Sequence, residues 1–287
     1  MSIRPVLAGL ASLLLLAAPI TPAAALQVAP GQQTTAIAST RLSVPASDGR
    51  AVLLDVWTAP DERGVVVFSH GFGGAPEAYR RLLSAWAQHG FTVIAPLHVD
   101  SQKHPNRDAT GQVAFVTRLV DLGVARTEAA RTHPDKPLIV AGHSFGSLMS
   151  LIEGGAVTVA GPMGDPAVKG VIAFSSAGNI PNVVTPDTYR TLDGPLLMIT
   201  GDRDLVPGFA DDWRDHRTAF DASPAGDKTL MIFAGADHQL PGTADGERFD
   251  QIVRATEDFL DAYALNDAAA RARLQTFAAD GVTVERR

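Results

Sequence analysis

The sequence predicts an α/β fold in which a mostly parallel central sheet is covered by helices on both faces. Short, continuous apolar runs recur along the chain, and such runs are typical of strands that are buried on both faces. Segments with apolar residues at helical spacing separate these runs. The 287 residues are 46% hydrophobic and 19% charged, an ordinary globular composition that argues against a collagen-like, disordered or coiled-coil chain.

Residues 1–25 predict a secretory signal peptide. Arg4 supplies the positive start, and residues 6–18 form an apolar run that is shorter than the roughly 20 residues needed to cross a bilayer. Residues 23–25 are alanines, the small residues that signal peptidase requires. The alternative is a membrane anchor that is never removed. We expect cleavage, and therefore an exported protein, periplasmic or secreted, with no stable membrane anchor.

After a flexible lead at residues 26–36, the chain alternates expected strands and helices. The runs at 52–57 and 65–68 are apolar and indicate strands. Pro76 is tolerated in a first helical turn, and the apolar side chains after it recur at helical spacing until Gly90. The same reasoning predicts, in order, a strand at 91–95, a helix over about 113–124, a strand at 138–141 and a helix that carries residues 148–152.

We predict one catalytic domain at residues 37–265, whose second half continues this alternation. A last long helix carries apolar side chains from Phe249 to Tyr263, and residues 266–287 are expected to form a peripheral helix and a frayed tail. Apolar runs predict three further strands, at 171–174, 196–199 and 230–233. The first two of these strands lie only about twenty residues apart, which is too few for a large cap domain.

The segment Gly142-His143-Ser144-Phe145-Gly146 is the strongest local signal for chemistry. It follows an expected strand and opens an expected helix, so Ser144 sits on a sharp turn in a strained backbone conformation. Glycine occupies both positions that must be small. Such a turn raises the serine oxygen above the sheet and points N–H groups at a developing oxyanion. We predict that Ser144 is a nucleophile; the alternative is a glycine-rich turn with an ordinary serine.

A glycine-rich loop, residues 69–74, follows the expected strand at 65–68. Its three glycines let the backbone turn inward without Cβ clashes. In an acyl-transfer site a loop in this place supplies an oxyanion donor, which we assign to the backbone N–H of Phe72, paired with that of Phe145. His70 is then expected to hold the loop by hydrogen bonds. The alternative is a tight loop that binds no ligand.

An acid and a histidine follow the nucleophile in the order serine, acid, histidine. Asp202 and Asp204 come directly after one expected strand, and His238 lies in the loop after the next. An acid at the carboxyl end of a strand can orient an imidazole that acts as the base for a serine. The two aspartates are two residues apart, so in an extended segment they point to the same side, and alternation does not choose between them.

Together these motifs resemble the α/β-hydrolase superfamily over roughly residues 50–265. The loop at 70–74 and the elbow at 142–146 are similar to those of an exported serine esterase branch. That branch includes polyester hydrolases, acetylhydrolases of the platelet-activating-factor type and dienelactone-hydrolase-like proteins. Its acid stands three residues after a glycine, so the resemblance implies Asp204 rather than Asp202.

The chain departs from parts of this branch in two ways. Dienelactone hydrolases use a cysteine where this chain has Ser144. Polyester hydrolases carry a tryptophan after the strand that follows the elbow helix, and often a C-terminal disulfide. Here that stretch is Ser175-Ser176-Ala177-Gly178, and the chain has no cysteine at all. A polymer substrate is therefore not supported.

The function that we predict is an exported serine hydrolase that cleaves small-molecule carboxylic esters through an acyl-enzyme, with no cofactor and no metal. His238 would take and return the Ser144 proton, and Asp204 would hold the imidazole in the useful tautomer. A net charge of −7, from 24 basic and 31 acidic side chains, argues against a nucleic-acid partner. Two alternatives stay open, an acyltransferase with the same three residues and a non-catalytic binding protein of this fold. Nothing in the sequence indicates an oligomeric state.

The remaining histidines are expected to be structural or solvated. His98, Asp100 and His104 follow the strand at 91–95, and their spacing matches no common metal site. We expect them to be solvated loop residues, some of which could line the substrate cleft. His216 is expected at the surface or at the end of an element. His143 precedes the nucleophile and is expected to pack against the elbow rather than to act as a base.

Overall fold

The computed structural model describes residues 36–178, 180 and 183–287 of the chain. The expected signal peptide, residues 1–25, and the lead up to residue 35 lie outside the described residues. Of the helices that are described, none is both long enough and apolar enough to cross a lipid bilayer.

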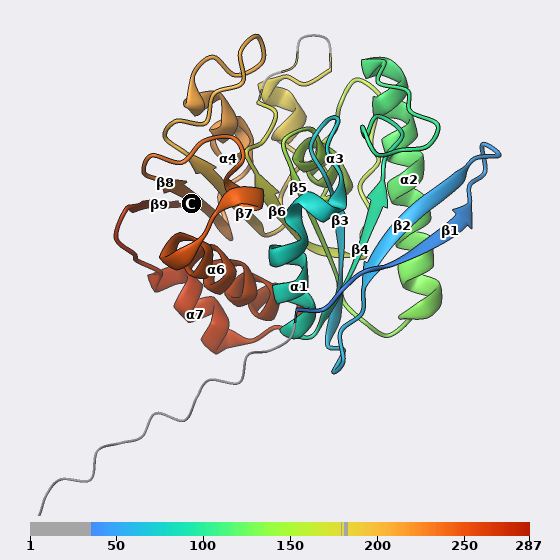
Figure 1. Ribbon diagram of the computed structural model, residues 1–287. Helices are drawn as coiled ribbons and strands as arrows, with labels where there is room; N and C mark the ends of the chain where they lie inside the picture. Colours follow the sequence, from blue (N-terminus) through green and yellow to red (C-terminus); the bar gives the residue numbers. More distant parts are fainter. Residues whose placement is uncertain (1–35, 179, 181–182) are drawn as a thin grey trace, which may run out of the picture. The chain divides into compact units, whose positions relative to one another are not determined.

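A nine-stranded sheet forms the centre of the described chain (Figure 1). Its strands are β1 (Thr40–Pro45), β2 (Ala51–Trp57), β3 (Gly64–Ser69), β4 (Phe91–Leu97), β5 (Leu138–His143), β6 (Val168–Phe174), β7 (Leu196–Gly201), β8 (Lys228–Phe233) and β9 (Val282–Arg286). Their order in the sheet is β1-β2-β4-β3-β5-β6-β7-β8-β9. All neighbours from β4 to β8 pair in parallel, whereas the β1–β2, β2–β4 and β8–β9 pairs are antiparallel. The prediction of a mostly parallel sheet is confirmed.

Helices cover both faces of this sheet, as predicted (Figure 1). The α-helices are α1 (Arg80–Gln88), α2 (Gly111–Thr132), α3 (Phe145–Glu153), α4 (Thr218–Ala222), α5 (Leu240–Thr243), α6 (Gly246–Ala264) and α7 (Ala268–Thr276). Short 3₁₀ turns are η1 (Pro76–Tyr79), η2 (Pro186–Tyr189) and η3 (Trp213–Arg217). The core under α1, α6 and α7 is separate from the core under α2, α3 and α4.

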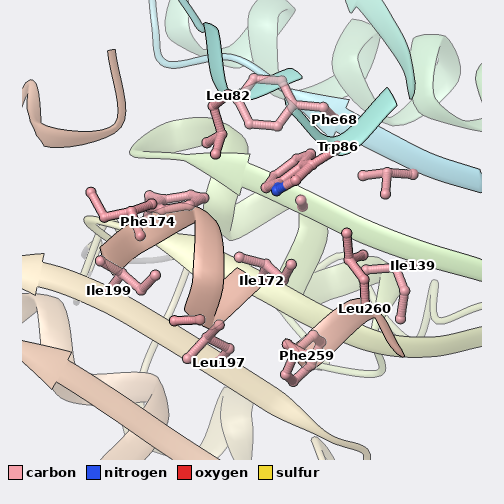
Figure 2. Close-up of a cluster of buried hydrophobic side chains, with 14 of the residues drawn as sticks. Phe68, Leu82, Trp86, Ile139, Ile172, Phe174, Leu197, Ile199, Phe259 and Leu260 are labelled. Atoms are coloured by element: carbon pink, nitrogen blue, oxygen red, sulfur yellow. The ribbon is translucent and has the colours of Figure 1, made fainter. Parts of the chain in front are cut away.

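The central strands are apolar along their whole length because side chains on both of their faces are buried. Every residue of β3, β5, β7 and β8 is buried. Figure 2 shows one of the two cores, in which Trp86 of α1 and Phe259 of α6 lie with Ile139, Ile172 and Leu197 of the strands. The Trp86 indole N–H donates to Thr256 Oγ1 at 2.9 Å, so the polar atom of this fully buried ring is paired.

Two features of the fold differ from or add to the sequence analysis. The chain beyond residue 265 forms α7 and then β9, which pairs with β8 through residues 282–286. The expected frayed tail is therefore wrong, because a short Val-Thr-Val run at the end of the chain adds an edge strand to the sheet. Between β6 and β7 the described residues contain only the 3₁₀ turn η2, so no large cap is present there, as expected.

The strand order places a site at the carboxyl ends of the strands. Strand β4 lies on one side of β3 and β5 lies on the other, with α1 and α2 on opposite faces. In open α/β sheets ligands bind beyond the carboxyl ends of strands at such a reversal of order. The loops after β3 and β5, which carry the glycine-rich motifs, leave the sheet at this point.

Candidate active site

Ser144 occupies a strained turn between β5 and α3. It has φ 55° and ψ −121°, although it is not a glycine, and its main-chain N–H donates to Phe174 O at 2.9 Å. The two flanking glycines make this turn possible. A Cβ at Gly142 would lie 2.3 Å from Gly146 O, and a Cβ at Gly146 would lie 2.0 Å from Ser69 O. The close approach of three backbone segments thus requires glycine at both positions.

The structure brings Ser144, His238 and Asp204 into one hydrogen-bonded chain. Ser144 Oγ lies 2.9 Å from His238 Nε2, and His238 Nδ1 lies 2.7 Å from Asp204 Oδ1. Because a carboxylate only accepts, Nδ1–H donates to Asp204, and Nε2 is left to accept the Ser144 hydroxyl proton. The His238 side chain is 17% exposed, whereas Asp204 is fully buried.

Asp204 and not Asp202 contacts the imidazole, because the two carboxylates lie in different environments. Besides His238, Asp204 accepts from the Thr200 hydroxyl at 2.8 Å. Burial alone would raise the pKa of Asp204, but its hydrogen bonds to His216 and His238 outweigh burial and hold that pKa far below its usual range. Asp202 is exposed and accepts a hydrogen bond from the main-chain N–H of Gly235.

His143 supports the site through a second chain of hydrogen bonds. Its Nε2–H donates to the main-chain oxygen of His238 at 2.7 Å, and its Nδ1 accepts from the Tyr79 hydroxyl at 2.7 Å. The Gly71 N–H in turn donates to the Tyr79 oxygen at 3.3 Å. Burial lowers the pKa of His143 to about 3 and raises the pKa of Tyr79 to about 12, so both side chains are neutral. This chain connects the glycine-rich loop to the backbone of His238.

The expected oxyanion donors, the N–H groups of Phe72 and Phe145, are both unused. Among the described residues neither N–H has an acceptor, although the N–H groups of Gly71 and Gly73 beside Phe72 both donate to side chains. The Phe72 and Phe145 rings meet edge to face with centroids 6.1 Å apart. The two residues are therefore neighbours in space, beside the nucleophile.

A buried ion pair holds the glycine-rich loop in shape. Arg118 donates from Nε and Nη2 to both carboxylate oxygens of Asp100, each at 2.8 Å, and both side chains are fully buried. Arg118 also donates to His70 O at 2.6 Å and to Gly71 O at 3.2 Å. Asp100 Oδ2 accepts from the Gly73 N–H at 2.8 Å. The pair therefore binds the backbone on both sides of Phe72.

The expectation that His98 and Asp100 are solvated is wrong. His98 is fully buried, where Nε2 accepts from the Ser69 hydroxyl and Nδ1–H donates to Asp121, each at 2.9 Å. Its main-chain N–H donates to His70 Nε2 at 3.1 Å. His70 thus holds the loop by hydrogen bonds, as expected. The reason for the error lies in α2, which folds back and brings Arg118 and Asp121 against this loop.

His216 is a second histidine that contacts the Asp204 carboxylate, and the sequence analysis did not identify it. It was expected at the surface or at the end of an element; it lies in the short turn η3 and is 1% exposed. Its Nε2 lies 2.8 Å from Asp204 Oδ1 and donates to the Asp204 main-chain oxygen at 3.1 Å. Its Nδ1 donates to Ser176 O. No local motif marks this residue, because the contact depends on how η3 packs against the loop after β7.

One group of described residues, Asp204, His216 and His238, has ligand atoms close enough to hold a metal ion, all within 4.8 Å of one another. These atoms already form hydrogen bonds with one another. A ring nitrogen that bears the proton of such a bond cannot ligate a metal at the same time. The arrangement therefore fits a proton-bearing network better than a metal site.

A family model described as serine aminopeptidase, S33, matches residues 60–194 of the chain. This match covers slightly less than half of the sequence. It includes the glycine-rich loop and Ser144 but ends before Asp204 and His238. No curated protein matches the chain at a significant level.

Solved structures of several hydrolases have the same fold. A carboxyl esterase from Bacillus coagulans, solved with glycerol, is 16% identical with a TM-score of 0.63 and covers 79% of this chain and 99% of its own. A monoglyceride lipase from Saccharomyces cerevisiae, solved with a substrate analogue, is 14% identical with a TM-score of 0.60. The match covers 81% of this chain and 97% of the lipase. An esterase domain from Rhodothermus marinus is 17% identical with a TM-score of 0.57, and the match covers 79% of this chain and 99% of that domain.

Proposed function

We propose that the chain is a member of the α/β-hydrolase superfamily, and that it is a serine hydrolase that cleaves carboxylic esters of small molecules. The observation that carries this proposal is the unbroken hydrogen-bonded chain from Ser144 Oγ through His238 to buried Asp204, with distances of 2.9 Å and 2.7 Å. A binding protein has no need of all three residues in this geometry.

The geometry supports catalysis in two steps. Ser144 Oγ attacks the ester carbonyl while its proton moves to His238 Nε2, and the tetrahedral intermediate then expels the alcohol, which takes that proton. Water next attacks the acyl-enzyme and gives a proton to His238. The second tetrahedral intermediate then breaks its bond to Ser144 Oγ, which takes that proton back from His238, and the acid is released. Throughout, Asp204 remains ionised and stabilises the imidazolium that forms on His238.

The free N–H groups of Phe72 and Phe145 are the proposed oxyanion donors. Negative charge develops on the carbonyl oxygen in each step, and a preorganised donor to that oxygen is worth about 2.7–4 kcal/mol. Both groups lack a partner within the described chain, so they lose no other hydrogen bond on binding. Arg118 and Asp100 fix the loop that carries Phe72, which keeps this donor in place before substrate arrives.

Aromatic rings beside the nucleophile favour an apolar ester. Phe145 contacts Phe72 at a centroid distance of 6.1 Å and Phe115 at 6.5 Å. Phe72 is 50% exposed and so presents its ring to solvent or to substrate. We therefore propose that one side of the substrate, the acyl chain or the alcohol, is apolar and packs on these rings.

Turnover of p-nitrophenyl acetate, butyrate and octanoate tests this function. The wild type should hydrolyse at least one ester, and Ser144→Ala should lower kcat by about 10⁴–10⁶-fold with the circular dichroism spectrum unchanged. A fluorophosphonate probe should label the wild type and a Ser150→Ala control but not Ser144→Ala. Near wild-type turnover by Ser144→Ala would contradict the proposal.

Two further assays separate the alternatives. If added glycerol or methanol diverts most of the acyl group into a new ester, the enzyme is an acyltransferase rather than a hydrolase. An aminoacyl p-nitroanilide tests the activity that the description of the family model suggests. A higher kcat/KM for the anilide than for the corresponding ester would replace ester hydrolysis by amide hydrolysis.

We also propose that the protein is exported, on the strength of the signal-like residues 1–25. Cell fractionation followed by N-terminal sequencing tests this. The mature chain should begin at Leu26 and lie outside the cytoplasm; an intact N-terminus on a cytoplasmic protein would contradict export.

A further inference from the structure

His216 is buried against Asp204 but has no part in the mechanism above. It lies in η3, which begins where the Asp212 side chain accepts from the Arg214 N–H and caps the turn. The His216 ring lies nearly parallel to the His238 ring, with centroids 5.6 Å apart and 28° between the planes. One carboxylate, Asp204, therefore has two imidazole rings beside it.

The hydrogen bonds of His216 require a proton on each ring nitrogen. Nδ1 faces the main-chain oxygen of Ser176, which can only accept. Nε2 faces the main-chain oxygen of Asp204 at 3.1 Å and the Asp204 Oδ1 at 2.8 Å. The first of these can only accept, so Nε2 must carry a proton as well. An imidazole that donates from both nitrogens is an imidazolium.

The partners of Asp204 lead to the same assignment. Its carboxylate is approached by His216 Nε2, His238 Nδ1 and the Thr200 hydroxyl. An ionised Asp204 carboxylate can accept a hydrogen bond from each of these three donors. If Asp204 were protonated, its own O–H would face one of these donors and no hydrogen bond could form there. Burial alone would lower the pKa of His216, but the hydrogen bond and the charge of Asp204 outweigh it and raise that pKa.

Among the described residues, Asp204 is the anion that contacts both rings. His143 faces His238 with centroids 4.7 Å apart and is neutral. Arg203 is exposed, and the other charged groups on the flanking segments pair elsewhere: Arg214 with Asp212, Arg217 with Asp221 and Glu285, Asp202 with the Gly235 N–H, Asp215 with the Asp212 N–H, and Asp237 with the Gln239 N–H. Asp204 is thus the anion that His216 and His238 share.

We propose that His216 is a positioning residue of the esterase site, which as an imidazolium keeps Asp204 ionised and adds a fixed positive charge beside His238. The inference rests on the proposed function. Because the His216 ring lies 5.6 Å from the His238 ring, replacing His216 by a neutral side chain should change the pH dependence of kcat/KM.

Histidine NMR tests the charge without any turnover. In ¹⁵N-labelled Ser144→Ala protein at pH 7, His216 should show two protonated ring nitrogens, and His143 should show one. A His216 ring with one unprotonated nitrogen would overturn the proposal, whatever the protein hydrolyses. A wild type that turns over no ester would instead contradict the proposed function, and the ring spectrum would still decide the state of His216.

Kinetics of substituted enzymes test the consequence of the charge. His216→Gln can keep a donor toward Asp204 but removes the charge. It should move the acidic limb of kcat/KM up by roughly 1–2 pH units, because a positive charge is removed from beside the base. His89→Gln is the matched control, because His89 also pairs with a carboxylate, Asp261 at 3.0 Å, but at the other end of the strands. Its profile should equal that of the wild type.

If His216→Gln folds and has the acidic limb of the wild type, the charge of His216 has no effect on the base and the proposal is wrong. If His216→Gln does not fold, the NMR experiment on the protein with native His216 decides it.

Discussion

Asp202 Oδ1 accepts a hydrogen bond from the Gly235 N–H at 2.6 Å and so connects the loop after β7 to the loop that carries His238. Asp204, two residues later, contacts the imidazole itself. The two aspartates therefore have separable roles: Asp202 holds the loop that carries His238, and Asp204 orients the His238 imidazole.

Single amide substitutions should distinguish these roles. Asp204→Asn should lower kcat by about 10⁴-fold, because an amide in this place favours the wrong imidazole tautomer. Asp202→Asn keeps an acceptor for Gly235 and should change kcat by less than about tenfold. The measurement is kcat on a p-nitrophenyl ester, with circular dichroism as the check on folding. A larger loss in Asp202→Asn would mean that Asp202 is the acid of the site.

The ion pair of Arg118 with Asp100 should be essential for stability. Asp100→Asn leaves the Arg118 charge buried without its partner, and breaking a buried pair costs about 3–5 kcal/mol. The exposed pair of Arg190 with Asp187 is the control, since removal of such a pair by Arg190→Met costs about 0–1 kcal/mol. Urea unfolding measures both. Equal, small changes in the free energy of unfolding would show that the buried pair contributes no more than a surface pair.

Much of the site could be predicted because its residues belong to local motifs. Gly142 and Gly146 stand two positions from Ser144, and the clashes that a Cβ would cause there follow from the turn itself. The same holds for the glycine-rich loop after β3. Both aspartates follow the same strand, so Asp204 was preferred over Asp202 through a family resemblance and through Val206-Pro207, which turns the chain directly afterwards.

The residues that sequence analysis placed wrongly all have partners on other elements of the fold. His98 pairs with Asp121 of α2, and His216 pairs with Asp204 through the packing of η3. In both cases the sequence shows a polar residue in a loop, where solvent exposure is the ordinary expectation. Burial depended on a tertiary contact that no spacing in the sequence reveals. The same reason explains β9, whose pairing partner β8 lies about fifty residues earlier.

Glycine at position 146 should be irreplaceable, whereas glycine at position 123 should not. The Cβ of Gly146→Ala would meet the backbone oxygen of Ser69, which cannot move without displacing β3, so we expect a loss of about 3 kcal/mol or more and loss of activity. Gly123 lies inside α2, and no described atom beyond the helix's own backbone lies within 4 Å of the place that a Cβ would take, so Gly123→Ala should stabilise the protein by about 0.5–1 kcal/mol. Thermal unfolding compares the two. A stable, active Gly146→Ala would show that the elbow relaxes.

Stability should fall as the pH drops below about 6.5, because three buried histidines are neutral in the folded protein. Burial holds the pKa values of His70 and His98 well below their ordinary value and that of His143 at about 3. The unfolded chain takes up these protons near pH 6.5, whereas the folded chain does not. Each histidine therefore removes about 1.4 kcal/mol of stability per pH unit below that point.

Asp121 opposes part of this loss. Burial raises its pKa to about 6, so the folded protein takes up one proton there while the unfolded carboxyl stays ionised down to about pH 4. Between about pH 6 and pH 5 the unfolded chain therefore binds two more protons than the folded chain, three on the histidines minus one on Asp121. The free energy of unfolding should fall by about 2.7 kcal/mol over that pH unit. Urea unfolding at pH 7, 6 and 5 measures how the free energy of unfolding depends on pH. His143→Gln removes one of the three histidines and should reduce this dependence by about 1.4 kcal/mol per pH unit. A free energy of unfolding that is constant over this range would show that these histidines are protonated in the folded protein.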